Sequence, residues 1–317
     1  MDIRKLTNNE LYLYDELLVK AESAYIFQAR PYLDCLKFLN QEYEITGIFI
    51  DNELVYALPI QKKKIPLIDR YYYYVPMGVV SSRYFIPNHI VEEFTKYLMK
   101  KGIIIKLSLN QEFSNSNFKL EKYNTTLIID LNKSLDDIFS NFSKTHRNCT
   151  RKAEKDGVIV TIDKNINTIN IFIELYEKLV KLKEIEAISI KFLKNVLTNL
   201  INNDLGFFAI AKYNDIIYNI AFISTVGKKA RYLYGASLRI DEKLPPIGQL
   251  LHYEIIKYLK DNGFISYDFG GIPNLPVSLD DKAYSVYKFK KGFGGDALIT
   301  SYEYVFTRYK ALSYILH

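Results

Sequence analysis

The sequence predicts an α/β protein in which one structural unit, a mixed sheet flanked by helices, occurs twice. Three observations lead to this prediction. The chain of 317 residues exceeds the usual size of one hydrophobic core, a strand–turn–strand pattern recurs, and a helix–glycine–strand pattern recurs at nearly the same offset. Because both patterns recur in the same order, we interpret the chain as a tandem duplication.

The first recurring pattern is a pair of apolar strands joined by a tight polar turn. Residues 51–60 read DNELVYALPI after the apolar run GIFI, and residues 213–223 read YNDIIYNIAFI after GFFAIAK. Placing Asn52 on Asn214 aligns the two segments at a shift of 162 residues. Adjacent Asn and Asp between apolar runs favour a two-residue hairpin turn, so each segment is predicted to be a hairpin.

The second pattern is an amphipathic helix followed by a glycine and a β-rich run. The segments KYLMKKGIIIKLSL, from Lys96, and KYLKDNGFISYDFG, from Lys257, match at a shift of 161 residues. Gly102 and Gly263 are each expected at the C′ position, where a left-handed residue ends a helix at little cost to glycine. Antiparallel strands, a helix and a further strand together predict a mixed sheet.

This order of elements resembles the GNAT acyltransferase fold. In the second copy, ARYLYGAS (230–237) would be the strand before the helix, QLLHYEIIKYLKDNG (249–263) the helix, and FISYDFGG (264–271) the strand after it. The expected fold class is therefore α/β, more specifically an α+β mixed sheet in two tandem GNAT-like domains. We place these domains at residues 1–124 and 125–301, and expect the second to contain the acyl-transfer site.

The usual cofactor loop of the GNAT fold is poorly matched. In GNAT enzymes a Gln/Arg-x-x-Gly-x-Gly/Ala loop at the helix N-terminus holds the pyrophosphate of coenzyme A with backbone N–H groups. The corresponding segment LRIDEKLPPIGQLL (238–251) has one glycine, Gly248, and two prolines, which have no N–H donor. The scaffold resembles GNAT, but its coenzyme A site is poorly supported.

A basic helix is expected after the domain boundary. Ser134 and Asp137 form a capping-box pattern that opens one helix, and a second helix is expected from about Lys144 to Asp156, ending at Gly157. Spacings of three and four residues place four cations on one face of it, namely Lys144, Arg147, Arg151 and Lys155. A solvated surface explains such a face, but mutual repulsion among the cations favours an anionic ligand such as phosphate.

The segment AYSVYKFKKGFGGD (283–296) combines three lysines, two phenylalanines and three glycines. Taken alone, it predicts a strand with Tyr287 and Phe289 on one face, Lys288 and Lys290 on the other, and a glycine turn at its end. It is not a P-loop, because the order Gly-x-x-x-x-Gly-Lys-Ser/Thr is absent.

Four segments resemble those of the Fem-type peptidyltransferases, double-GNAT proteins that build the interpeptide bridges of peptidoglycan. They are SKTHRNCTRKAEKDGV (143–158), LYGAS (233–237), YDFGG (267–271) and YKFKKGFGG (287–295). FQARPYLDCLK (27–37) is a looser match, with Tyr32 where Trp is common in the family. No long helical hairpin fits between residues 165 and 204, so the chain resembles the compact members. The resemblance also implies that residues 302–317 return to the first domain.

The resemblance implies an aminoacyltransferase that moves an aminoacyl group from charged tRNA to an amine of a peptidoglycan precursor. The precursor, nucleotide- or lipid-linked, would bind in a cleft between the domains, and the donor would be held through phosphates and ribose without a cofactor. Phe289 and Lys290 match the family's Phe-Lys pair, which approaches the tRNA 3′ end. Lys37 stands roughly where a lysine contacts precursor phosphate, and Arg147 and Arg151 match the family's basic helix.

Acyl transfer to an amine requires a neutral nucleophile, a stabilised oxyanion and a proton path. Lys290 is the candidate that supplies charge and an N–H donor to the oxyanion, with Phe289 shaping the pocket and the glycines admitting a bulky donor. Asp268 and Asp296 are candidate proton acceptors, although an aspartate at a strand end also caps turns. The further candidates for substrate and phosphate binding are Lys37, Lys144, Arg147, Arg151, Tyr234, Tyr287, Lys291 and Gly294.

Two other functions stay open. One is an N-acyltransferase that takes its acyl group from coenzyme A or an acyl carrier and acts on a sugar nucleotide or an envelope polysaccharide precursor. The other is a non-catalytic double-GNAT protein that only binds nucleic acid or a cell-envelope precursor.

Composition disfavours several classes of protein. The two cysteines, Cys35 and Cys149, and the four histidines show no CxxC or metal-type spacing, so no disulfide framework or metal site is expected. The N-terminus lacks an apolar h-region and the longest apolar runs are strand-sized, which predicts a cytoplasmic protein without a membrane span. It would work at the inner membrane face if its acceptor is lipid-linked. The net charge of +6 permits an anionic partner, and we expect a monomer or weak dimer.

Overall fold

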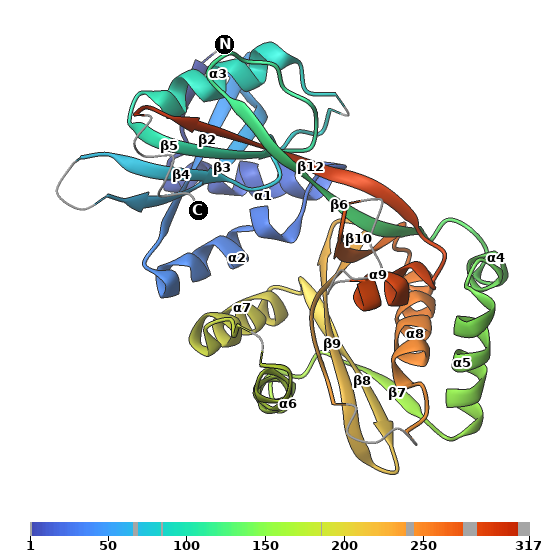
Figure 1. Ribbon diagram of the computed structural model, residues 1–317. Coiled ribbons are helices and arrows are strands. Elements are labelled where there is room, and N and C mark those ends of the chain that lie inside the picture. Colours follow the sequence, from blue (N-terminus) through green and yellow to red (C-terminus); the bar gives the residue numbers. More distant parts are fainter. Residues whose placement is uncertain are drawn as a thin grey trace. The chain divides into compact units, whose positions relative to one another are not determined.

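The computed structural model describes residues 2–65, 69–83, 85–184, 186–238, 244–274 and 284–309. The protein has the expected mixed α/β class and divides into two compact units (Figure 1). Unit 1 comprises Met1–Asn124 and Ile299–His317, and unit 2 comprises Thr125–Leu298. Within the described ranges, no helix has both the length and the apolar character that a membrane crossing requires.

Unit 1 is a mixed sheet with helices on both faces. Its elements are β1 (Asp2–Lys5), η1 (Asn8–Glu10), α1 (Leu11–Lys20), η2 (Ile26–Gln28), α2 (Arg30–Leu33), η3 (Asp34–Leu39), β2 (Glu42–Ile50), β3 (Glu53–Lys64), β4 (Tyr71–Val75), α3 (Asn88–Met99), β5 (Gly102–Leu109) and parts of β6 (Lys119–Asp130) and β12 (Asp296–Thr307). The strands lie in the order β1-β2-β3-β4-β5-β12. Figure 1 shows α3 on one face of this sheet and α1 on the other.

The C-terminal part of the chain returns to unit 1, as the family resemblance implied. β12 pairs antiparallel with β5, with Tyr302 opposite Leu109 and Thr307 opposite Ile104. Residues 310–317, the rest of the segment for which this return was expected, lie outside the described residues.

Unit 2 repeats the plan of unit 1. Its elements are the end of β6, α4 (Leu135–Ser140), α5 (Lys144–Lys155), β7 (Ile159–Asp163), α6 (Thr168–Lys183), α7 (Ile190–Asn202), β8 (Gly206–Tyr213), β9 (Ile216–Val226), β10 (Lys229–Ser237), α8 (Ile247–Asp261), β11 (Ser266–Ile272), α9 (Tyr284–Lys291) and the start of β12. The strands lie in the order β6-β11-β10-β9-β8-β7. In Figure 1, α6 and α7 lie on one face of this sheet, and α4, α5 and α8 lie on the other.

The sheet of unit 2 opens between β10 and β11. These parallel strands pair only where Lys229–Arg231 lies opposite Ser266–Asp268. After Asp268, β11 also changes register against β6, because Asp268 faces Ile128 while Gly271 faces Thr126. Two residues of β11 are thus bulged at the point where the strands separate, and bulges commonly redirect groups at functional sites.

The two hairpins of the duplication have the same turn. Asp51 and Asn52 join β2 to β3 with φ of 51° and 66°, and Asn214 and Asp215 join β8 to β9 with φ of 49° and 62°. Two consecutive left-handed residues are the mark of the primed hairpin turns, which Asn and Asp adopt more readily than other residues. The hairpin predictions are confirmed.

The two helix ends of the duplication differ. Gly263, with φ of +76°, has the expected left-handed conformation after α8. Gly102 does not: it begins β5, and a Cβ there would lie 2.9 Å from Leu98 O and 2.8 Å from Ile105 Cγ1. The prediction of a left-handed C′ residue at Gly102 is wrong. Glycine is needed there because the chain passes too close to the end of α3 for a side chain.

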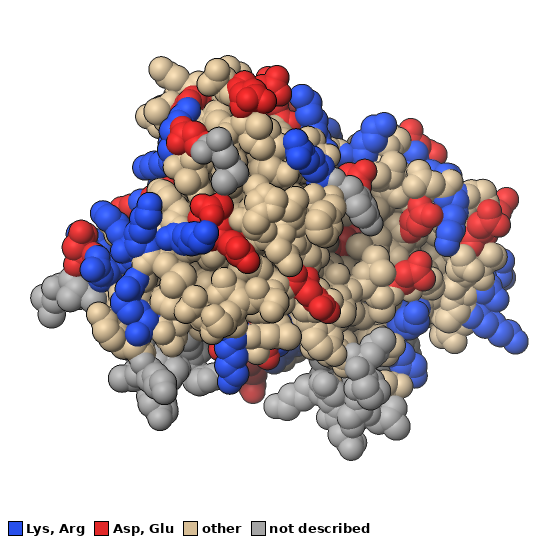
Figure 2. Space-filling view, turned by 90° about the horizontal axis from the view of Figure 1, so that it is seen from above, with Lys and Arg blue, Asp and Glu red and all other residues tan. Residues whose placement is uncertain are grey.

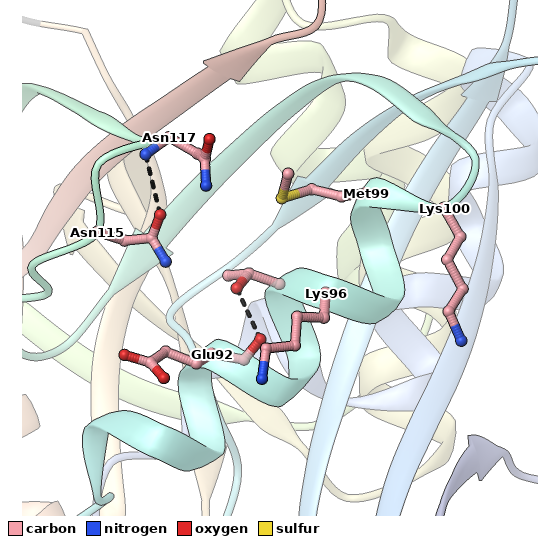
Figure 3. Close-up of a pocket in the computed structure, with 7 residues that line it drawn as sticks. Glu92, Lys96, Met99, Lys100, Asn115 and Asn117 are labelled. Atoms are coloured by element: carbon pink, nitrogen blue, oxygen red, sulfur yellow. Dashed lines mark hydrogen bonds between the residues drawn. The ribbon is translucent and has the colours of Figure 1, made fainter.

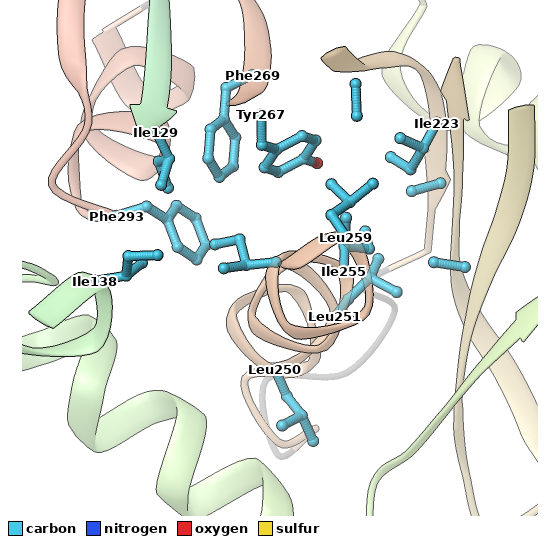
Figure 4. Packing of buried hydrophobic residues seen from close by; sticks show 14 of the residues in the cluster. Ile129, Ile138, Ile223, Leu250, Leu251, Ile255, Leu259, Tyr267, Phe269 and Phe293 are labelled. Carbon is cyan, nitrogen blue, oxygen red and sulfur yellow. The ribbon is translucent and has the colours of Figure 1, made fainter. Parts of the chain in front are cut away.

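The core of unit 2 forms between α8 and the sheet. Leu251, Ile255 and Leu259 follow one face of α8 at intervals of four residues, and each is at most 1% exposed. Figure 4 shows this face with Tyr267 and Phe269 of β11 packed nearby. Burying each such side chain stabilises the fold by roughly 1.5–3 kcal/mol, so α8 fixes β11 firmly.

The helices predicted after the domain boundary are present. Ser134 Oγ accepts a hydrogen bond from Asp137 N at 3.0 Å and opens α4. α5 begins after Ser143, whose Oγ accepts from His146 N at 3.2 Å, and it is followed by Gly157 with φ of +88°.

The strand predicted at Tyr287–Lys290 is wrong, because Tyr284–Lys291 forms the helix α9. Gly292 N donates to Lys288 O at 3.1 Å, and the rings of Phe289 and Phe293, four residues apart, lie 5.2 Å apart. A ring contact at this spacing marks one side of a helical turn. Because aromatic and basic residues alternate here, the sequence pattern suggested a strand and not this helix. Ala283, the first residue of the quoted segment, lies outside the described residues.

Candidate functional site

Lys290 extends from α9 toward the opening between β10 and β11. Its Nζ donates a hydrogen bond to Gly271 O at 2.7 Å. The pKa of Lys290 is lowered to about 8, mainly by burial; the carboxylate of Asp268 opposes this shift and the positive charge of Arg231 contributes to it. At pH 7 about nine in ten of these side chains are still ammonium ions. The site therefore presents a cation that loses its proton far more easily than an ordinary lysine.

A buried ion pair lies beside Lys290. Arg231 of β10 and Asp268 of β11 are paired in register, and Arg231 Nη1 contacts Asp268 Oδ2. Asp268 Oδ1 accepts from Thr126 Oγ1 and, at 2.6 Å, from the backbone N–H of Gly270. Asp268 is 5% exposed. The candidate proton acceptor thus lies next to Lys290, where its charge is already paired and hydrogen-bonded.

Aromatic rings support α9 from behind. The ring of Phe289 lies 5.2 Å from Phe293, 5.6 Å from His146 of α5 and 5.7 Å from His252 of α8, measured between centroids. His146 Nε2 lies 2.9 Å from Phe289 O. Because a carbonyl only accepts, Nε2 has the proton, and Nδ1 accepts from Ser143 Oγ at 3.2 Å. Phe289 is therefore held by packing and through its own backbone.

His252 is buried in this cluster and uncharged. Burial is the main reason that its pKa falls to about 3, and the positive charge of Lys290 lowers it further. Its Nδ1 lies 2.9 Å from the hydroxyl of Tyr267. Sequence reasoning missed His252. The available signal was its position on the apolar face of α8, three and four residues before the buried Ile255 and Ile256.

The glycines after α9 approach this chain's own atoms. A Cβ at Gly292 would lie 2.1 Å from His146 Cε1, and one at Gly294, where φ is +78°, would lie 2.2 Å from Asn141 O. A Cβ at Gly295 would lie 2.4 Å from Leu127 Cδ2. These positions need glycine so that the turn packs against its neighbours. That the glycines also admit a bulky donor stays a prediction.

The first turn of α8 packs against Phe289. Pro246 precedes the helix, Ile247 N donates to Pro245 O at 2.8 Å, and no side chain caps the helix. A Cβ at Gly248 would lie 3.3 Å from Phe289 Cζ, so the ring covers the side of this turn. Residues 239–243, the earlier part of the segment compared with a cofactor loop, lie outside the described residues.

The basic face of α5 has partners within unit 2. Arg147 Nη1 donates to the carbonyl of Ser140, the last residue of α4, at 2.7 Å, and also to Phe142 O just after the helix. The guanidinium of Arg151 lies 5.2 Å from the ring centroid of Phe139. Lys144 and Lys155 are exposed. The cations do share the helix as predicted, but the two arginines are explained by contacts with α4. Phosphate binding by this face stays a prediction.

The remaining predicted residues lie in different places. Tyr234 is half-buried on β10 beyond an irregularity in its pairing with β9, and Tyr287 packs on the core from α9. Lys291 Nζ donates to Gly295 O at 3.2 Å. Lys37 is exposed on η3 in unit 1, with its ammonium 5.4 Å from the ring centroid of Phe38. The structure therefore joins Lys290, Phe289 and Asp268 into one cluster.

A separate hollow of about 340 Å³ lies in unit 1. α3 lines it with Glu92, Thr95, Lys96, Met99 and Lys100, and the loop before β6 adds Asn115 and Asn117 (Figure 3). Internal hydrogen bonds already satisfy part of this lining, because Thr95 Oγ1 donates to Glu92 O and Asn117 N donates to Asn115 Oδ1. The residues predicted to act in the function do not line this hollow.

Among the described residues, neither the surface charge nor the possible metal ligands indicate a further functional site. Figure 2 shows basic and acidic side chains interspersed over one face, which agrees with the modest net charge of +6. Among the described residues, no three His, Cys, Asp or Glu side chains gather as a metal site would require. Cys35 is buried, Cys149 is half-buried, and neither forms a disulfide.

Sequence comparison links the second half of the chain to acyl transfer. Residues 140–289 match a family model described as an acetyltransferase (GNAT) domain. A lipid II:glycine glycyltransferase of Staphylococcus epidermidis is 32% identical over 97 residues, which are 31% of this chain and 23% of that protein. The Staphylococcus aureus protein of the same name is 30% identical over 142 residues, covering 43% and 33%. The matches thus span a third or less of these relatives.

Structural comparison covers the whole chain and shows the fold. The crystal structure of FemX superposes with a TM-score of 0.83 at 17% identity and covers 100% of both chains. The C-terminal domain of a putative lysylphosphatidylglycerol synthetase from Agrobacterium fabrum gives 0.59 at 11% identity, covering 95% and 94%. The two-unit fold is therefore of the FemX type.

Proposed function

We propose that this chain, which is similar to lipid II:glycine glycyltransferases and has the fold of FemX, transfers an aminoacyl group from charged tRNA to an amine of a peptidoglycan precursor. The acceptor would be a lipid-linked precursor, the class named for the staphylococcal relatives. The observation that carries the proposal is Lys290, a half-buried ammonium held 2.7 Å from Gly271 O where β10 and β11 separate.

The geometry suits attack of an amine on an ester. The acceptor nitrogen attacks the ester carbonyl carbon, the new N–C bond forms an amide, and the C–O bond to the ribose breaks. The proton lost by the amine ends on the ribose oxygen. The Lys290 ammonium would stabilise the oxyanion of the tetrahedral intermediate, because donors fixed in a poorly hydrated site stabilise developing charge strongly.

The start of α8 supports a donor other than coenzyme A. Two prolines remove N–H donors where a pyrophosphate would be held, and Phe289 covers the side of the first turn at Gly248. A tRNA donor needs no pyrophosphate cradle, because its phosphates and ribose offer contacts elsewhere.

Transfer assays with both donor classes test the proposal. The full chain is incubated with mixed radiolabelled aminoacyl-tRNA and, separately, with labelled acetyl-CoA, each with lipid-linked and nucleotide-linked precursors. We expect label from aminoacyl-tRNA in the lipid-linked precursor. Turnover of acetyl-CoA without transfer from tRNA would overturn the proposal and favour the coenzyme A-dependent alternative.

A Lys290→Ala variant tests the role of the ammonium. Removing one oxyanion donor costs about 10²–10³-fold in kcat, so we expect a loss of that order. Lys288→Ala is the matched control, since Lys288 lies on the same helix and is exposed. Full transfer by Lys290→Ala would place the reaction elsewhere. A wild type that is inactive with both donor classes would favour a non-catalytic protein.

A further inference from the structure

A series of hydrogen bonds and one ion pair connects residues of three strands, β6, β10 and β11, to Lys290. Thr126 of β6 and Arg231 of β10 hold the two oxygens of Asp268 on β11. Asp268 Oδ1 also accepts from Gly270 N at 2.6 Å, which folds the bulge in β11. Gly271 O, at the end of that bulge, then accepts from Lys290 Nζ at 2.7 Å.

The contacts of Asp268 are largely shielded from water, whereas the bond from Lys290 to Gly271 O lies on the solvent side. Asp268 is 5% exposed, Thr126 is 1% exposed, and the Arg231 side chain is 20% exposed. Gly270 has φ of +77°, a conformation that favours glycine, and a Cβ there would lie 3.4 Å from Tyr232 O and 3.8 Å from Lys290 Nζ. The bulge therefore has one geometry that satisfies both the carboxylate and the ammonium.

We propose that Arg231 and Asp268 are positioning residues that set the place and the charge state of Lys290. Asp268 presents Gly271 O to the ammonium by folding the bulge, and Arg231 fixes Asp268. The proposal rests on the proposed function only in placing Lys290 at the reacting centre. It assigns Asp268 a fixed negative charge in place of the role of proton acceptor.

The other groups around Lys290 are either uncharged or exposed to solvent. From α8, His252 is uncharged at pH 7 because burial holds its pKa at about 3, and from α5 burial lowers the pKa of His146. From β10, burial raises the pKa of Tyr232 to about 12, so its hydroxyl keeps its proton. On α9 itself, Lys288 and Lys291 are exposed to solvent, which screens their charges. Among the described residues, Asp268 and Arg231 are thus the charges that act on Lys290.

The two members of the pair act on the Lys290 ammonium with opposite sign. The carboxylate of Asp268 favours the protonated form, and the guanidinium of Arg231 disfavours it. Asp268→Asn should therefore lower the pH at which Lys290 loses its proton, and Arg231→Met should raise it. We expect shifts of about one pH unit in each direction.

The experiment measures the pH dependence of amine acylation at Lys290 by acetic anhydride in the full chain, read peptide by peptide by mass spectrometry. Lys288 serves as the internal reference. Transfer activity is measured over the same pH range. The pH at which activity changes as Lys290 loses its proton should shift together with the pH at which labelling of Lys290 is half complete. Because labelling needs no substrate, failure of the proposed function leaves this result standing.

Asp163→Asn is the matched control. Asp163 of β7 also accepts from a threonine hydroxyl, that of Thr168, and from an N–H two residues on, that of Asn165 at 2.8 Å. β7 lies at the edge of the unit 2 sheet, four strands away from β11 in the sheet order. This variant should leave the labelling midpoint of Lys290 unchanged.

A double variant covers the case in which a single change prevents folding. Arg231→Met with Asp268→Asn removes both charges together, which proteins tolerate better than one unpaired buried charge. Its labelling midpoint should return toward that of the wild type, and a midpoint that stays a full pH unit away would contradict the proposal.

The single variants offer two further outcomes. An unchanged labelling midpoint in Asp268→Asn with abolished transfer would overturn the proposal in favour of Asp268 as proton acceptor. Unchanged midpoints in both single variants would reduce the pair to a purely structural role.

Discussion

Replacing Lys290 by methionine should stabilise the protein at neutral pH. Methionine keeps most of the length of the lysine side chain and has no charge. Burial is the main reason that the pKa of Lys290 falls from 10.5 to about 8. The folded-state pKa lies below the unfolded one, so between these pH values the unfolded chain binds more protons. Stability of the wild type therefore rises with pH across that interval, and the full penalty applies below pH 8.

The magnitude follows from the difference between the two pKa values. Each pKa unit corresponds to about 1.4 kcal/mol, which gives an upper limit of about 3 kcal/mol at pH 7. The hydrogen bond from Lys290 to Gly271 O lies on the solvent side of the cluster, where water screens the charge. We therefore expect Lys290→Met to gain about 1–2 kcal/mol at pH 7 and roughly half of that gain at pH 9.5.

Urea unfolding of the wild type and Lys290→Met at pH 7 and pH 9.5, followed by tyrosine fluorescence, measures the effect. Lys288→Met is the control, because Lys288 is exposed on the same helix. A gain that is absent at pH 7, or identical at both pH values, would refute the reasoning that Lys290 is held as a desolvated cation. Stability gained together with activity lost is the expected behaviour of a functional residue.

Two further predictions concern stability, and thermal unfolding tests both. Gly294→Ala and Gly263→Ala both place alanine at positive φ, but only the first would put a Cβ 2.2 Å from Asn141 O. Gly263→Ala should cost about 1 kcal/mol and Gly294→Ala clearly more; equal costs would contradict the close approach. His252 has a folded-state pKa of about 3, well below the ordinary value of 6.5. Below pH 6.5 the unfolded chain therefore binds a proton that the folded chain does not, so the free energy of unfolding falls as the pH falls. His252→Leu should remove this acid sensitivity, and a stability difference from wild type that is constant between pH 7 and pH 4.5 would argue against a buried neutral His252.

Much of the fold could be predicted from sequence because the signals are local. The Asn-Asp turns need left-handed residues, and Asn and Asp adopt that conformation readily. α5 follows from its basic periodicity and from Gly157 at its end. The same local reasoning failed at α9, because eight residues are few enough for an alternating pattern to fit a strand and a helix equally well.

The candidate site was predictable in part. The sequence pointed to Lys290, Phe289 and Asp268, and the structure brings them together. It could not show that Asp268 is paired with Arg231, or that His252 lies behind Phe289, since neither residue belongs to a recognisable spacing. From the sequence we expected the glycines after α9 to admit a donor, because the local sequence does not reveal that Gly294 lies close to Asn141.

The sequence by itself determined the duplication, the hairpin turns, the helices that flank each sheet and the lysine on which the proposed chemistry depends. The structural features follow from backbone preferences and periodicity, and the lysine follows from the resemblance of its segment to the Fem-type family. Only the tertiary structure decided what surrounds that lysine. Its neighbours come together through strand register, which joins Asp268 to Arg231 across 37 residues and to Thr126 across 142. Such pairings depend on how whole strands align and separate, and no local pattern encodes that.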